Sequence, residues 1–222
     1  MGPAADEHLA QLVQRYPDLA DCLDDLGRAL DLLAVCYRGG GKVLFCGNGG
    51  SAADCEHIVG ELMKGYRQPR PLPAAVRQQI EEGLPENGAY LADHLQGALP
   101  ALSLVSQVGL ATAYANDVAA DMVFAQQVYG YGRPGDVVVG ISTSGNSQNV
   151  IHALQVARAM GLTTLGFTGR YGGALKAACD VTIAVPQEDT AAIQEQHLAV
   201  YHALCGALEE MFFESESVMR DA

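Results

Sequence analysis

The stretch DVVVGISTSGNSQNVIHALQVARAM, residues 136–160, decides how the rest of the chain is interpreted. A short apolar run from Val137 to Ile141 ends in a loop of small polar residues, and a helical pattern of apolar residues then begins at Val150. Four hydroxyl side chains lie within six positions of this loop: Ser142, Thr143, Ser144 and Ser147. Strand, loop and helix in this order are typical of an α/β fold.

The composition of the loop predicts a phosphate site. The following helix points unpaired N–H groups and the positive end of its dipole at the loop, and the hydroxyls add donors. Gly145 allows a backbone conformation that a side chain would obstruct. The loop has no lysine, which argues against a GxxxxGK[ST] nucleotide site and favours a phosphate monoester. An ordinary helix cap is the alternative, but capping needs one hydroxyl rather than four.

A second turn of the same kind lies earlier, in GNGGSAADCEHIVGELMKGY at 47–66. It follows an expected strand at 43–46 and opens a helix at Ser51, with Asn48, Gly49 and Gly50 in the loop. The segment also fits the dinucleotide pattern GxGxxA. A Pro-rich basic turn follows where that fold would place a second strand ending in an acid, so we favour a phosphosugar over a dinucleotide.

The remaining chain predicts a single domain over 1–222. Further strands are expected at 101–106, 163–167 and 180–185, and a last helix at 190–213. Strands that alternate with helices predict a parallel sheet covered on both faces. The helical segment 7–37 has more apolar surface than one sheet needs, which predicts an oligomer. Residues 72–98 are expected to form a helical insertion outside the sheet.

Composition excludes several classes of protein. Of the 222 residues, 49% are hydrophobic and 18% charged, as in a globular protein. A net charge of −13 argues against general binding to nucleic acid or to anionic membranes. No apolar run approaches the roughly 20 residues of a membrane span, and no signal peptide is evident, so we expect a cytoplasmic protein. The six scattered cysteines suit a reducing compartment rather than a disulfide frame.

Two helices carry the candidate chemistry. His57 and Glu61 are four residues apart and share one helix face, and the last helix carries Gln194, Glu195, His197 and His202. A carboxylate and an imidazole near a held phosphate suit proton transfer beside a carbonyl, but spacing alone does not choose among the acids and histidines of the last helix. His57, Glu61, Gln194 and His202 could instead bind a divalent metal, and a solvated helix face is the third interpretation. His197 is expected to be structural or exposed.

Four segments together resemble the sugar isomerase (SIS) domain family, and within it the phosphoheptose isomerase branch. They are GNGGSAADCEHIVGEL at 47–62, the Asn–Asp pair at 116–117, GISTSGNSQNV at 140–150 and IQEQHLAVYHAL at 193–204. The resemblance covers roughly residues 7–213, although 72–98 fits poorly.

The resemblance implies a three-layer α/β/α sandwich and a homotetramer with active sites between subunits. It implies isomerisation of sedoheptulose 7-phosphate to D-glycero-D-manno-heptose 7-phosphate through an enediol, with Glu61 as base and His202 as its acid/base partner. It implies zinc in some members, one ion per subunit, and no nucleotide cofactor. The substrate positions implied are Asn48, Gly49, Gly50, Ser51, Glu61, Asn116, Asp117, Ser142, Thr143, Ser144, Ser147 and Gln194. The zinc positions implied are His57, Glu61, Gln194 and His202.

Two departures from the family pattern bear on the sugar that is bound. Ala191 and Ala192 stand where relatives often carry polar residues, and the insertion at 72–98 is longer. An isomerase or binder of another phosphosugar is therefore one alternative. A non-catalytic adaptor that binds the replication initiator is another, because the same branch resembles such a protein. The presence of Glu61, Gln194 and His202 favours catalysis.

Overall fold

The computed structural model describes residues 3–213, with side chains from residue 7 onward. Within these residues one parallel sheet has five strands in the order β2-β1-β3-β4-β5. The strands are β1 (Val43–Gly47), β2 (Ala101–Ser103), β3 (Val137–Ile141), β4 (Thr163–Thr168) and β5 (Val181–Ala184). In register, Val43 pairs with both Ala101 and Val137, so the carboxyl ends of β1 and β3 lie side by side.

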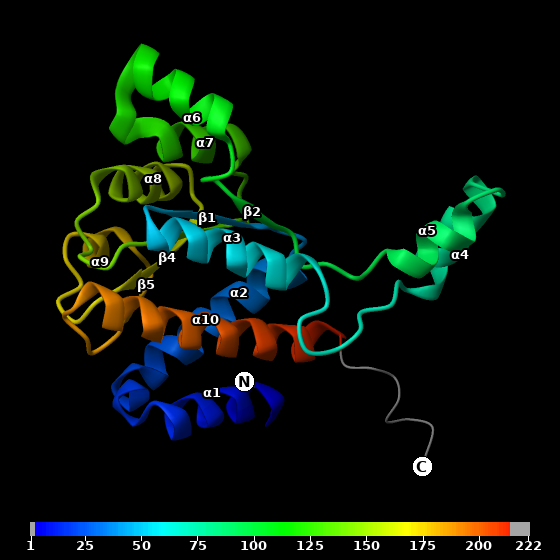
Figure 1. The fold of residues 1–222 in the computed structure, drawn as a ribbon, viewed down its shortest axis with the longest axis horizontal. Helices are drawn as coiled ribbons and strands as arrows, with labels where there is room; N and C mark the ends of the chain where they lie inside the picture. Colours follow the sequence, from blue (N-terminus) through cyan, green and yellow to red (C-terminus); the bar gives the residue numbers. More distant parts are fainter. Residues whose placement is uncertain (1–2, 214–222) are drawn as a thin grey trace.

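Helices cover both faces of the sheet, which confirms the predicted α/β/α sandwich (Figure 1). Val43 and Phe45 of β1 point into one apolar cluster, and Leu44 and Cys46 point into the other, because successive strand side chains alternate. One face carries α1 (Pro3–Arg15), the 3₁₀ helix η1 (Pro17–Cys22), α2 (Leu23–Arg38), α3 (Gly50–Met63) and α10 (Thr190–Phe213). The other carries α7 (Val123–Tyr131), α8 (Gln148–Ala159) and α9 (Leu175–Ala178).

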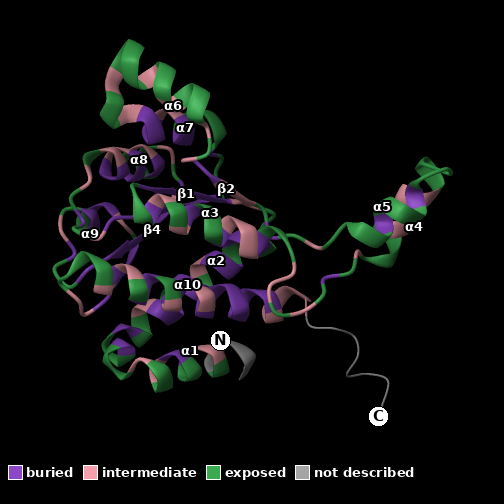
Figure 2. Cartoon of the chain, viewed as in Figure 1, coloured by how far each residue is buried: buried purple, intermediate pink, exposed green. Residues whose placement is uncertain are grey.

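The N-terminal segment is helical as predicted, and much of its apolar surface is buried within the chain. α1 packs along α10 and α2 lies under the sheet (Figures 1 and 2). Leu9, Leu12, Leu19, Leu26 and Leu30 are buried, whereas Leu23 and Val35 are exposed. That this segment takes part in an oligomer stays a prediction.

The insertion forms a helical hairpin that projects from the body (Figure 1). Its helices are α4 (Ala74–Gly83) and α5 (Gly88–His94), close to the predicted stretches, and we call residues 73–95 the arm. Arg77 of α4 joins the two helices by its contact to Asp93 of α5 (2.5 Å), and it also pairs with Glu81 within α4 (2.9 Å). None of the residues of α4 is buried (Figure 2). Five larger apolar side chains of the arm are exposed: Val76, Leu84, Tyr90, Leu91 and Leu95.

Two stretches differ from expectation. The strand predicted over 101–106 ends at Ser103, because the chain turns at Val105 after Leu104 N–H bonds to the carbonyl oxygen of Phe45 (2.9 Å). The helix after it, α6 (Val108–Tyr114), continues as one π turn, η2 (Ala115–Ala119), and a 3₁₀ turn, η3 (Ala120–Met122).

No described helix has both the length and the apolar character needed to cross a membrane.

His197 was predicted to be either structural or exposed, and it lies in the core. Its side chain is fully buried, and Nε2 donates to the carbonyl oxygen of Thr168 (3.2 Å). Burial lowers the pKa of His197 to about 4, and the hydrogen bond only partly opposes this. The imidazole is therefore neutral in the folded chain at neutral pH.

We expect this histidine to make stability depend on pH. The unfolded histidine has a pKa of about 6.5, so between that pH and about 4 the unfolded chain binds more protons. Stability is therefore lost as the pH falls through this window, by about 2 kcal/mol between pH 7 and pH 5. Urea unfolding at both pH values should show a smaller loss for His197→Leu, and an unchanged loss for His94→Leu, whose side chain is exposed. Equal losses in all three proteins would contradict this assignment.

Candidate functional site

The two glycine- and serine-rich loops meet at the carboxyl edge of the sheet. They follow β1 and β3, which are neighbours, so parallel pairing brings them together. The side-chain amides of Asn48 and Asn149 exchange two hydrogen bonds of 2.9 Å between the loops. Gly49 has φ 57°, the left-handed region that glycine adopts readily.

The hydroxyl loop has the geometry of an anion cradle. The hydroxyls of Ser142 and Ser147 lie 2.9 Å apart, and Ser144 Oγ accepts the N–H of Asn146 (3.2 Å). Ser142 is buried, so it orders the loop from below. Ser144 is exposed, and Thr143 and Ser147 are half-buried. Three hydroxyls therefore remain accessible at the start of α8, where the helix dipole favours an anion.

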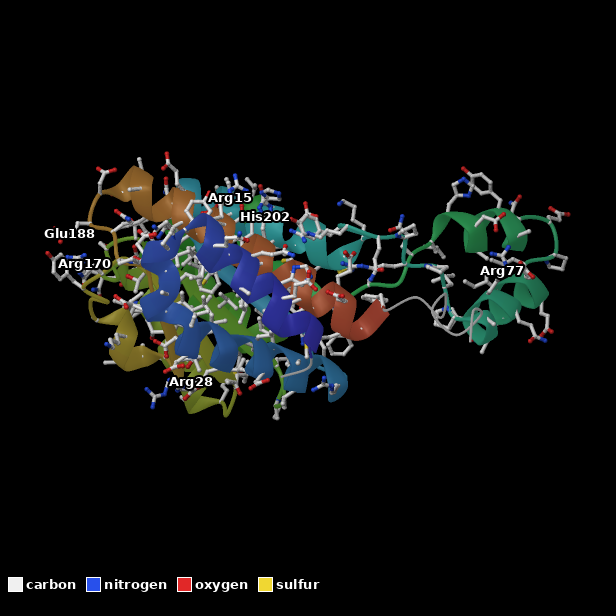
Figure 3. The ribbon with its side chains drawn as sticks, turned by 90° about the horizontal axis from the view of Figure 1, so that it is seen from below. Arg15, Arg28, Arg77, Arg170, Glu188 and His202 are labelled. Carbon is white, nitrogen blue, oxygen red and sulfur yellow. The ribbon has the colours of Figure 1, made fainter. Side chains whose placement is uncertain are left out.

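On one face of the sheet, α3 and α10 bring three titratable side chains together. His57 Nε2 lies 3.3 Å from Glu61 Oε1 and 3.4 Å from Nε2 of His202. The ring of Tyr66 stacks on His202, with centroids 5.6 Å apart and planes at 15°. Figure 3 shows His202 on α10 close to Arg15 of α1. Spacing along the sequence placed His57 beside Glu61 but could not place His202 with them.

The electrostatics of this cluster suit proton transfer. The side chain of Glu61 is 14% exposed, and Lys64 Nζ lies 3.5 Å from its Oε2. Burial lowers the pKa of His202, and His57 and Arg67 lower it further against the opposing effect of Glu61. His202 is therefore neutral near pH 7 and can both give and take a proton.

A buried ion pair fixes the two helices that carry the cluster. Arg70 is 1% exposed and donates to Glu209 Oε1 (2.8 Å) and to the carbonyl oxygens of Leu62 (2.7 Å) and Glu61 (2.9 Å). Glu209, on α10, also accepts the backbone N–H groups of Tyr66 and Arg67, both at 2.7 Å. The sequence indicated only a basic turn here, because burial of an arginine leaves no local signal.

A hollow of about 410 Å³ opens beside His202. Its wall contains two Arg–Tyr pairs, Arg15 with Tyr16 and Arg67 with Tyr66, in which each guanidinium lies 5.5 Å from the ring centroid. The full lining is His8, Gln11, Leu12, Arg15, Tyr16, Tyr66, Arg67, Leu198, Ala199, His202 and Ala203, with no carboxylate. In a chain of net charge −13, this surface is suited to an anionic ligand.

The other predicted residues divide between the two groups. Gln194 lies against the first loop, because a Cβ added to Gly50 would come 2.4 Å from its Nε2. Asn116 and Asp117 bond to each other (2.8 Å) on η2, across the sheet from α10 (Figure 1). Within one chain, the Asn–Asp pair and α10 therefore lie on opposite sides of the sheet (Figure 1). Asp189 caps α10 by accepting the N–H groups of Ala191 (3.0 Å) and Ala192 (3.2 Å).

The predicted zinc ligands fit an ion only in part. The separations of 3.3 and 3.4 Å around His57 Nε2 match the roughly 3.3 Å between ligand atoms about 2.0–2.1 Å from a tetrahedral zinc. Among residues 3–213, however, no group of three or more His, Cys, Asp or Glu side chains is arranged to hold a metal ion. The zinc prediction therefore remains a prediction.

Comparison with known proteins identifies relatives over nearly the whole chain. The SIS domain family model matches residues 9–78 and 88–169, with its gap inside the arm. A phosphoheptose isomerase of Rhodospirillum rubrum is 40% identical over 192 residues, which are 86% of this chain and 88% of that protein. A phosphoheptose isomerase of Maridesulfovibrio salexigens is 42% identical over 183 residues, 82% of this chain and 77% of that protein.

Solved structures agree with these relatives. The phosphoheptose isomerase GmhA from Neisseria gonorrhoeae has a TM-score of 0.68 at 34% identity, covering 90% of this chain and 94% of its own. A phosphoheptose isomerase from Francisella tularensis has a TM-score of 0.73 at 26% identity, covering 92% of this chain and 96% of its own. The fold that the resemblance implied is confirmed.

We expect Gly145→Ala to destabilise the hydroxyl loop. Gly145 has φ 67°, and an added Cβ would lie 2.1 Å from the carbonyl oxygen of Gly172. The left-handed conformation alone costs about 1–2 kcal/mol with a side chain, and the clash adds to it. Gly109→Ala is the matched control, because that glycine is helical and its added Cβ meets open space. Thermal unfolding should show a lower Tm for Gly145→Ala only, and equal Tm values would argue against this packing.

Proposed function

This chain belongs to the SIS domain family, and we propose that it is an aldose–ketose isomerase that converts sedoheptulose 7-phosphate to D-glycero-D-manno-heptose 7-phosphate. The observation that carries the proposal is the meeting of His57, Glu61 and His202 in a chain about 40% identical to phosphoheptose isomerases. The hydroxyl loop supplies the phosphate donors that such a substrate requires.

The phosphate orients the sugar and the carboxylate moves the proton. Glu61 removes a proton from C1 of the ketose, and the released electron pair forms a double bond between C1 and C2. The carbonyl oxygen on C2 takes a proton from His202, which gives an enediol. In the second half Glu61 returns its proton to C2, the hydroxyl on C1 gives its proton to His202, and the aldehyde forms. Glu61 and His202 each end the cycle in the protonation state in which they began it.

We further propose that two subunits complete each active site within a homotetramer. Two observations on the described residues support this. The turn η2, which carries Asn116 and Asp117, lies across the sheet from α10 (Figure 1), so one chain does not gather all of its predicted substrate residues at one place. The arm exposes five larger apolar side chains on helices too short to be stable in isolation. A neighbouring subunit would both cover the arm and bring the missing residues.

Zinc and a cytoplasmic location belong to the same proposal. His57, Glu61, Gln194 and His202 would hold the ion, and the ligand-like spacing around His57 Nε2 supports this. When bound, zinc would act as a Lewis acid on a substrate oxygen. A reducing compartment is supported by the six cysteines, all of them free thiols.

Proton exchange tests the proposed function directly. Purified protein is incubated with sedoheptulose 7-phosphate in D₂O, with and without a chelator, and followed by NMR. Deuterium beside the carbonyl together with an aldose product would support the isomerase, and loss of exchange with the chelator would support a bound metal. No exchange with this sugar, but exchange with another phosphosugar, would contradict the substrate. No exchange with any phosphosugar, together with capture of the replication initiator, would favour the adaptor.

Glu61→Gln should abolish exchange and leave binding largely intact. The amide keeps the size of the side chain and removes its basicity, so the rate should fall by about 10²–10⁴-fold. Isothermal titration with the sugar phosphate measures the binding that remains. Glu82→Gln is the matched control, since Glu82 lies on α4 and bonds only to Gln78 (2.7 Å) among the described residues. Unchanged turnover in Glu61→Gln would remove this residue from the mechanism.

Ser144→Ala should chiefly weaken phosphate binding. Its exposed hydroxyl can donate one charge-assisted hydrogen bond to the phosphate, which contributes on the order of 1.5–3 kcal/mol. We therefore expect the Kd for the sugar phosphate to rise about 10–100-fold. The control is Ser106→Ala, whose hydroxyl bonds to Glu56 (2.8 Å) outside the loop. Normal affinity in Ser144→Ala would show that the loop holds another group.

A further inference from the structure

On the side opposite Glu61, the ring of His57 contacts a tyrosine hydroxyl, which in turn contacts a carboxylate. Tyr201 is 2% exposed, and its hydroxyl lies 2.9 Å from His57 Nδ1 and 3.3 Å from Asp54 Oδ1. Asp54 precedes His57 by three residues on α3, so the two side chains share a helix face. The rings of Tyr201 and His57 meet edge-on, with centroids 5.4 Å apart and planes at 75°. None of these contacts belongs to the acid/base pair described above.

The protons in this group can be counted. The phenol of Tyr201 has one O–H donor, and its oxygen can also accept a hydrogen bond. A carboxylate can only accept, so the tyrosine hydroxyl donates to Asp54. The hydroxyl oxygen then accepts from the atom that faces it, which is His57 Nδ1. A neutral His57 therefore carries its proton on Nδ1 and has a bare Nε2.

We propose that Tyr201 is a positioning residue that, with Asp54, holds His57 in the Nδ1–H tautomer and points its bare Nε2 at Glu61 and His202. The inference rests on the proposed function insofar as it concerns the same cluster. In this scheme the hydroxyl of Tyr201 contacts His57. It does not contact C1 or C2 of the sugar.

The tautomer matters because of what faces Nε2. Glu61 Oε1 lies 3.3 Å away, and a proton on Nε2 would be donated to this carboxylate. That hydrogen bond would stabilise the ionised carboxylate and weaken it as a base. With Nε2 bare, Nε2 and Oε1 are both acceptors, so His57 donates no hydrogen bond to the carboxylate. His202 Nε2, 3.4 Å from the same atom, can donate to it and is oriented in turn.

Histidine NMR tests the tautomer without reference to activity. The chain has six histidines, so protein labelled with [¹⁵N]histidine gives few signals in a long-range ¹H–¹⁵N spectrum. The spectrum is recorded with chelator at about pH 8, where an ordinary histidine is neutral, and His57→Gln assigns the signal of His57. We expect Nδ1–H in the wild type. In Tyr201→Phe we expect this preference to be lost in favour of Nε2–H.

Kinetics separate positioning from general stability. Tyr201→Phe should lower kcat by about 10–100-fold, as loss of an orienting partner does, with little change in KM. Tyr37→Phe is the matched control, because that hydroxyl is also buried but has no hydrogen-bond partner among the described residues. Asp54→Asn provides a second variant if Tyr201→Phe does not fold. The amide can donate to the tyrosine, whose hydroxyl then donates to His57 Nδ1, so Nε2–H is expected.

The outcomes are distinguishable from failure of the proposed function. A wild-type His57 in the Nε2–H form would overturn the inference, as would a Tyr201→Phe variant with unchanged tautomer and kcat. If no phosphosugar is isomerised but the tautomer depends on Tyr201, the proposed function fails and the positioning role stands.

Discussion

An ion pair without access to solvent fixes the geometry on which the candidate site depends. Burying two charges is costly unless every hydrogen bond is made, and here each oxygen of Glu209 accepts a backbone N–H while Arg70 also bonds to two carbonyl oxygens. Those carbonyls, of Glu61 and Leu62, are at the negative end of α3, where a cation is favourable. The pair therefore joins the end of α3 to α10, and Glu61 is held at a fixed distance from the helix of His202.

The charge of this pair is maintained by its surroundings. Burial alone would raise the pKa of Glu209, but the N–H groups of Tyr66 and Arg67 and the guanidinium of Arg70 lower it below its ordinary value. The same residues, Tyr66 and Arg67, line the hollow beside His202. The lining of the hollow and the buried ion pair thus belong to one packed unit. Helices rather than flexible loops therefore position Glu61 and His202.

Local patterns in the sequence were sufficient for most of the elements and for the two loops. An apolar run followed by small polar residues and a helical period identified β3 and α8 nearly to the residue, because backbone hydrogen bonding and side-chain alternation are local properties. Parallel pairing then required the loops after β1 and β3 to meet. The roles of the individual site residues stay predictions, although the cluster of His57, Glu61 and His202 is now a geometric fact.

What the sequence could not reveal depends on contacts between distant segments. Tyr201 and Asp54 come from helices more than a hundred residues apart, and the burial of Arg70 depends on where α10 ends. How much of the apolar surface of 7–37 the chain covers by itself depends on the same kind of contact, since α10 packs on it only in the folded chain.

The root of the arm has an evolutionary consequence. The chain leaves the body just after Arg70 and returns at Gly97, whose N–H bonds to the carbonyl oxygen of Arg70 (2.8 Å). Departure and return are thus adjacent, so a segment of almost any length can be accommodated there without moving β1, β2 or the ion pair, since the entropy of closing a loop grows only slowly with its length. Such a position lets a lineage acquire, exchange or lose an appendage while the sheet and the buried ion pair are inherited unchanged.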